Sequence, residues 1–183
     1  MHCIGQFSTD LKQQFTENYH EHAVHALYNR MADDVNRVKA HACGSLSNFL
    51  EKSSQDIGEQ YCEELLKRLM ECAKSSSSYC CGNAVTCIAS LAESCQKSFV
   101  PYYEQIFDEF ISIIKEPAPK EFRKFKGQII ESICISSVCI EIENFRPFAD
   151  RLVEALLVVQ KEHIGNDPGD PQRRYLLAAW QRL

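Results

Sequence analysis

An aromatic residue followed by apolar residues four and eight positions later recurs four times along the chain. The four triplets are Tyr19/Ala23/Leu27, Tyr61/Leu65/Leu69, Tyr103/Phe107/Ile111 and Phe148/Leu152/Leu156. Their aromatic residues are 42, 42 and 45 positions apart. Because residues four and eight apart share one face of an α-helix, each triplet predicts a helix with an apolar stripe. The near-constant spacing predicts a stack of similar units rather than one closed bundle.

Each of these helices is followed by a second apolar pattern. The second patterns are Val38/Ala42/Leu46/Phe49, Cys80/Ala84/Ile88/Leu91, Phe125/Ile129/Ile133 and Gln172/Leu176/Trp180/Leu183. Short breaks rich in serine, proline, glycine or aspartate separate the patterns, and such clusters end helices. No segment alternates apolar and polar residues with the period of two that a strand requires.

Two helices in about 42 residues are the size of HEAT and armadillo repeats. The sequence therefore predicts an all-α fold, a right-handed HEAT-repeat solenoid in which neighbouring helix pairs cover each other's apolar faces. The expected repeats are 18–52, 57–95, 99–141 and 145–183, and residues 1–8 are expected to end a preceding repeat. Neither end has the polar surface of a capping repeat, so residues 1–183 are expected to form a single solenoid segment of a longer protein.

Composition narrows the classes of function. The 25 acidic and 20 basic side chains give a formal net charge of −5, which argues against direct nucleic-acid binding. Although 45% of the residues are hydrophobic, no apolar run is long enough to cross a bilayer, so no membrane contact is expected. The ten cysteines lie mostly in apolar helical patterns, which is typical of buried free thiols in a reducing compartment.

Candidate catalytic and metal-binding patterns are weak. Residues 20–25 hold three histidines, but the helical zinc-protease pattern needs histidines four apart, and position 24 is valine. No C-x-x-C pair occurs, no base or oxyanion site can be assigned beside a thiol, and no glycine-rich phosphate loop is present. We therefore predict no catalytic residue, no metal site, no cofactor and no enzymatic activity. A thiol or metal enzyme is the least favoured class.

Polar residues on the second helices miss the apolar stripe and recur in repeat register. We expect six of them to contact a bound peptide: His41, Asn48, Asn83, Thr86, Gln128 and Glu131. Gly44 shares their register, and stacked helices would align these positions along the concave surface. Amide side chains can bond both N–H and C=O groups of an extended peptide, and carboxylates can bind lysine or arginine. The alternative is an ordinary solvated surface.

A family resemblance rests on short segments in the right order. Asp33-x4-Val38-Lys39 matches the HEAT signature, in which an aspartate ends the turn and a valine–basic pair opens the second helix. The other matching stretches are residues 5–10 (GQFSTD), 37–42 (RVKAHA), 48–49 (NF), 86–93 (TCIASLAE), 97–103 (KSFVPYY), 126–133 (KGQIIESI) and 170–172 (DPQ). In this order and spacing they resemble the karyopherin-β (importin-β) nuclear transport receptors, closest to the importin-five branch.

This resemblance implies a nuclear import receptor whose concave face binds basic nuclear-localisation-signal cargo, with residence in both cytoplasm and nucleus. Asn48 would match a groove asparagine of the family. The resemblance also implies two further partners: phenylalanine-glycine repeats of nucleoporins, and the Ran GTPase, which would bind through N-terminal repeats that have no counterpart here. The aromatic residues Tyr102, Tyr103, Phe107 and Phe110 are either convex pockets for such repeats or core. Another HEAT-repeat scaffold, such as a phosphatase regulatory subunit, is the alternative function.

Overall fold

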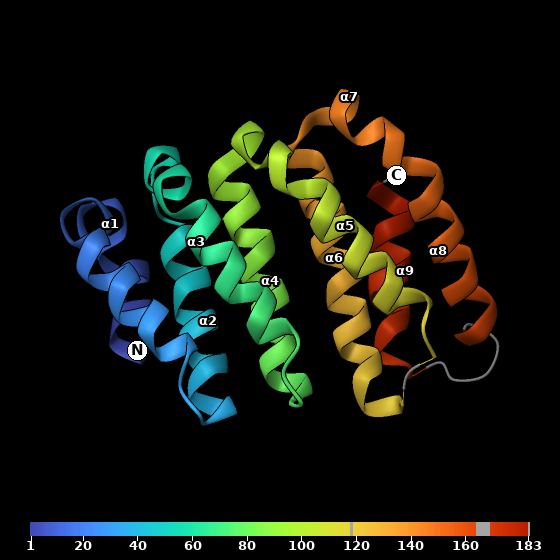
Figure 1. Cartoon of the computed structure of the whole chain (residues 1–183), viewed down its shortest axis with the longest axis horizontal. Helices are drawn as coiled ribbons and strands as arrows, with labels where there is room; N and C mark the ends of the chain where they lie inside the picture. Colours follow the sequence, from blue (N-terminus) through green and yellow to red (C-terminus); the bar gives the residue numbers. More distant parts are fainter. Residues whose placement is uncertain (118, 164–168, 183) are drawn as a thin grey trace. The chain divides into compact units, whose positions relative to one another are not determined.

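The chain is almost entirely helical in the computed structural model, which describes residues 1–117, 119–163 and 169–182 (Figure 1). The α-helices are α1 (His2–Met31), α2 (Asn36–Leu50), α3 (Gln55–Ala73), α4 (Ser78–Cys95), α5 (Val100–Lys115), α6 (Arg123–Cys139), α7 (Glu141–Phe145), α8 (Ala149–His163) and α9 (Pro171–Arg182). Short 3-10 helices are η1 (Gln96–Phe99), η2 (Lys120–Phe122) and η3 (Arg146–Phe148). Contacts divide the chain into two compact units, Met1–Gln96 and Lys97–Leu183, and each is described by itself.

In the first unit, α1 is two helices joined by a kink. Lys12 has a φ of 49°, outside the helical region, and the chain changes direction there. Residues 2–11 lie against α2, because the Ser45 hydroxyl donates to the Met1 carbonyl at 3.0 Å. Residues 13–31 pair with α2 through the short turn that follows Met31. The N-terminal piece therefore takes the place of a second helix beside α2.

Two layers of helices result within this unit. The first-helix layer consists of residues 13–31 of α1 together with α3, and the second-helix layer consists of residues 2–11, α2 and α4. The layers face each other through the predicted apolar stripe, since Leu27, Leu46, Leu65 and Ile88 are all at most 1% exposed. First helices thus pack on first helices and second helices on second helices, as in HEAT repeats.

Polar contacts fix the ends and the seams of these helices. Ser77 caps α4 by accepting a hydrogen bond from the Cys80 amide at 3.4 Å. Ser75 donates to the Asn36 side chain of α2 at 3.0 Å, so the serine-rich break also ties neighbouring repeats together. Between α2 and α4, the buried hydroxyls of Ser47 and Ser90 lie 2.6 Å apart.

The second unit repeats the arrangement, with α5 packed on α8 and α6 packed on α9. Its core contains an aromatic cluster in which the ring centroids of Phe107 and Phe148 are 5.0 Å apart. Gly127 of α6 is required by close packing, because a Cβ there would lie 2.2 Å from the Tyr175 ring of α9. The buried Lys126 amine donates to two carbonyls at the end of α5, those of Ile114 and of Glu116, the residue that follows the helix.

The predicted all-α class and paired-helix architecture are confirmed, and no described residue lies in a strand. No described helix has the length and apolar character needed to cross a membrane. The four repeat boundaries and the single-segment assignment stay predictions. The short helix α7 was not expected from the sequence, and the kink lies beyond the predicted partial repeat of residues 1–8. Leu183 lies outside the described residues.

Candidate binding groove

Three of the six predicted contact residues line one cavity on the second-helix layer of the first unit. The cavity has a volume of about 270 Å³ and lies among residues 2–11, α2 and α4. His41 and Asn48 of α2 are exposed and Asn83 of α4 is half-buried, so all three side chains are accessible. His41 and Asn48 are seven residues apart on α2 and therefore share one helix face. The packing of α4 on α2 brings Asn83 beside them.

Gly44 forms the floor of this cavity between His41 and Asn48. A Cβ at position 44 would lie 3.3 Å from Oδ1 of Asn83. The Asn83 amide is itself held in place, because its Nδ2 donates to the Tyr79 carbonyl at 2.8 Å. A side chain at position 44 would therefore fill space that the glycine leaves open.

The wall of the cavity includes residues that the sequence reasoning missed. His2 and Gln6 line it from the N-terminal piece of α1. Tyr79 packs edge-on against the His41 ring, with centroids 6.3 Å apart. The cavity lining contains imidazoles, amides, a hydroxyl and glycines, and it contains no carboxylate. Such groups can donate to and accept from the main chain of an extended peptide without reading its charge.

Thr86 lies one turn beyond Asn83 on α4, exposed but outside the cavity lining. Its hydroxyl donates to the Gly82 carbonyl at 3.0 Å, a bond within its own helix. Thr86 therefore extends the polar surface of α4 without adding to the cavity.

Gln128 and Glu131 belong to α6 in the second unit, where both are half-buried and three residues apart on one helix face. The pKa of Arg174 on α9 is raised mainly by its hydrogen bond to Tyr175, and the negative charge of Glu131 is a smaller contribution in the same direction. Sequence spacing did not reveal this neighbour, because α6 and α9 are brought together only by tertiary packing.

The aromatic residues proposed as convex pockets are mostly core. Tyr103, Phe107 and Phe110 are each at most 2% exposed, so an exposed pocket formed by them is wrong and the core alternative is confirmed. Tyr102 is half-buried. The rings of Tyr103, Phe107 and Phe110 fill the space between α5 and its neighbours and present no face to a partner.

The histidine and cysteine side chains form no evident reactive centre among the described residues. Among the described residues no three His, Cys, Asp or Glu side chains are grouped so as to hold a metal ion. His20 instead bonds the Tyr61 hydroxyl at 2.9 Å. Of the ten cysteines only Cys3 is exposed. Burial raises the pKa of the Cys81 and Cys134 thiols to about 11, whereas a hydrogen bond with Cys95 lowers the pKa of Cys62.

Comparisons with known proteins give one consistent result. No family model matches the chain. Importin subunit beta-3 of Saccharomyces cerevisiae is 29% identical over 181 residues, which are 98% of this chain and 16% of that protein. The crystal structure of Kap121p bound to Pho4p matches with a TM-score of 0.87, and that of the karyopherin Kap121p bound to the SUMO protease Ulp1p with 0.86. Both are 28% identical and cover 98% of this chain, which covers 16% of each.

The similarity runs along nearly the whole chain in sequence and in fold, although the chain spans about a sixth of the length of these relatives. It agrees with the helix packing, in which first and second helices form separate layers. In sequence and in fold the chain is therefore similar to a HEAT-repeat segment of the karyopherin Kap121p.

Proposed function

We propose that this chain is part of a nuclear import receptor and binds an extended, basic nuclear-localisation segment of its cargo along the second helices. The observation that carries the proposal is the cavity on α2 and α4, where His41, Asn48 and Asn83 converge. It is supported by the similarity to Kap121p, which has been crystallised bound to Pho4p. That similarity favours the receptor over a phosphatase regulatory subunit or another HEAT-repeat scaffold.

Each unit, taken by itself, offers a different chemistry to a bound segment. The amides of Asn48 and Asn83 are suited to hold the main chain of the cargo, because an amide both donates and accepts. The Glu131 carboxylate on α6 is suited to bind a cargo lysine or arginine through a charge-assisted hydrogen bond. Thr86 and Gln128 would add polar contacts along the same helices. Main-chain binding and charge recognition would then reside in separate residues.

The proposal includes further partners and a location. The receptor would move between cytoplasm and nucleus, contact nucleoporin phenylalanine-glycine repeats, and bind the Ran GTPase through parts outside this chain. A surface suited to a phenylalanine side chain is the cavity of about 630 Å³ beside α7 and α8, whose lining includes Ile142, Phe145 and Val153. Ile142 is 80% exposed there, so an apolar contact is open to a partner.

Peptide affinity tests the groove assignment. Fluorescence anisotropy of a labelled, extended lysine-rich peptide should report binding to the 183-residue chain. We expect Asn48→Ala to weaken binding by about 1 kcal/mol, roughly fivefold, the usual net contribution of a neutral hydrogen bond. The matched control is Asn29→Ala, an exposed asparagine on the first-helix layer, which should leave affinity unchanged. Equal affinity of the wild type and Asn48→Ala would contradict the groove assignment.

A further inference from the structure

A second cavity lies on the opposite layer of the first unit, between α1 and α3. Its volume is about 420 Å³. The side chains that matter for its chemistry are Glu21, His22, His25 and Tyr28 from α1, and Tyr61 and Glu64 from α3. The cavity on α2 and α4 does not include these side chains, and the packing of the core does not use the carboxylates of Glu21 and Glu64.

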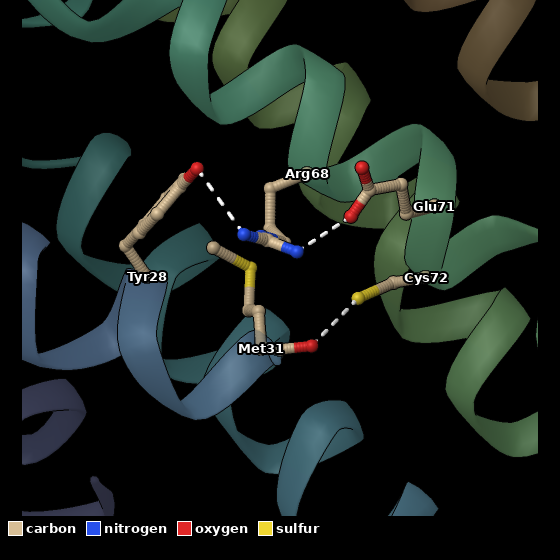
Figure 2. Close-up of polar contacts among 5 residues, drawn as sticks. All are labelled: Tyr28, Met31, Arg68, Glu71 and Cys72. Atoms are coloured by element: carbon tan, nitrogen blue, oxygen red, sulfur yellow. Dashed lines mark hydrogen bonds and ion pairs between the residues drawn. The ribbon is translucent and has the colours of Figure 1, made fainter. Parts of the chain in front are cut away.

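The two tyrosine rings of this cavity are held in position by neighbouring side chains. His20 bonds the Tyr61 hydroxyl at 2.9 Å, with the two ring centroids 5.9 Å apart. Tyr28 is held by Arg68, whose Nη2 donates to the Tyr28 hydroxyl at 3.3 Å while the guanidinium lies 4.8 Å from the ring centroid (Figure 2). Both rings are only half-buried, so part of each remains available to a ligand.

Neither Glu21 nor Glu64 forms an ion pair within the part of the chain that the structure describes. Both act on the Tyr61 hydroxyl, whose pKa is raised first by partial burial and then by these two negative charges. The cavity therefore combines negative potential with aromatic walls.

Arg68 shows how this surface accommodates a guanidinium. It stacks on Tyr28 and bonds the Glu71 carboxylate at 2.6 Å (Figure 2). Glu64 lies four residues before Arg68 on the same helix, the usual spacing of a helical ion pair. Arg68 nevertheless bonds Glu71 and not Glu64. The carboxylates of Glu64 and Glu21 therefore remain available in the cavity beside Tyr61.

We propose that this cavity binds an arginine side chain of a partner protein, in addition to the cargo groove on the other layer. The guanidinium would lie against the ring of Tyr61 and bond the carboxylates of Glu21 and Glu64. A planar cation fits better than an ammonium, because it can stack on a ring and present several N–H groups to two carboxylates at once. Negative charge on both helices excludes a phosphate or an acidic peptide as the occupant.

Nuclear magnetic resonance titration of the ¹⁵N-labelled 183-residue chain tests this proposal. The probes are the capped tripeptide Gly-Arg-Gly and the same peptide with neutral citrulline or with lysine in place of arginine. We expect the arginine peptide to shift amide signals of residues 20–28 and 60–68, and to bind at least about tenfold more tightly than the citrulline peptide. Equal binding of the citrulline or the lysine peptide would overturn the proposal, as would shifts confined to α2 and α4.

Two variants separate the cavity from surface charge in general. The double substitution E21Q and E64Q should abolish the shifts, while E63Q, an exposed carboxylate beside Glu64 that does not line the cavity, should preserve them. Unchanged binding by the double variant would also overturn the proposal. The assay uses one arginine and monitors α1 and α3, so its result is independent of whether the groove binds basic cargo.

Discussion

At Gly44, an effect on helix stability can be distinguished from an effect on peptide binding. A helical glycine is destabilising by roughly 0.5–1 kcal/mol relative to alanine, yet it occupies an accessible position in α2. A Cβ at position 44 would lie only 3.3 Å from Oδ1 of Asn83, so the glycine leaves room for the Asn83 side chain at the edge of the cavity.

We therefore predict different effects of Gly44→Ala on stability and on affinity. The free energy of unfolding should change by no more than about 1 kcal/mol, because the gain from alanine in a helix is offset by the shift that its Cβ forces on Asn83, whose amide bonds the Tyr79 carbonyl. Affinity for the basic peptide should fall severalfold. Urea unfolding and anisotropy measure the two quantities. A variant that loses stability and affinity together would instead assign Gly44 to packing.

Glu131 should differ from Asn48 in its dependence on salt. Removing its charge with Glu131→Gln should weaken binding of a lysine-rich peptide more at low than at high ionic strength, since salt screens a charge that solvent can reach and Glu131 is only half-buried. Glu154→Gln on α8 is the exposed control. The same loss at 50 mM and 500 mM salt would contradict a role in charge recognition.

Among elements, the connection between α3 and α4 shows what a local pattern predicts and what it leaves open. Its run of serines predicts a helix break. The hydrogen bond from Ser75 to Asn36 joins residues 39 positions apart, so a local sequence pattern could not predict it.

Ser77 gives a prediction at this scale. Ser77→Ala should lower the free energy of unfolding by about 1 kcal/mol, the usual cost of losing an N-cap. Ser76 is the matched control, since it is exposed and adjacent, and Ser76→Ala should have little effect. Urea unfolding followed by circular dichroism measures both variants. An equal loss for the two would show that the cap at Ser77 does not stabilise α4.

The helix stripes were predictable because helical register is a local property. Positions four and eight after each aromatic residue are buried in all four first helices, as the pattern predicts. The aromatic residues themselves vary, and Tyr19 is 56% exposed while Tyr103 is 2% exposed. A stripe determines which residues share a face, but not how far a neighbouring helix covers that face.

The kink in α1 and the short helix α7 could not be predicted, because no local sequence signal marks the backbone change at either place. Lys12 and Glu141 have φ values of 49° and 66°, a conformation that a sequence usually signals with glycine or asparagine. Because the kink at Lys12 was not foreseen, His2 and Gln6 were missed as part of the cavity. The common surface of His41, Asn48 and Asn83 could be predicted because only their helical spacing and the repeat length were needed, whereas their contact with a peptide stays a prediction.

At the scale of the whole molecule, the formal net charge of −5 is compatible with basic partners but does not say where they bind. Within the first unit the two layers differ in chemistry. The second-helix cavity is lined by neutral amides and imidazoles, and the first-helix cavity carries two carboxylates beside tyrosine rings. Two partners could therefore occupy this unit together, one held through its main chain and the other through an arginine side chain.

Site-specific photo-crosslinking can show whether basic cargo binds along the second helices. A benzophenone side chain is placed at Thr86, which is exposed on α4 next to the cavity, or at Ala26, which is exposed on α1 in the first-helix layer. We predict that a lysine-rich cargo segment crosslinks efficiently from position 86 and not from position 26, and that unlabelled cargo competes the product away. Crosslinking from position 26 alone would contradict the claim.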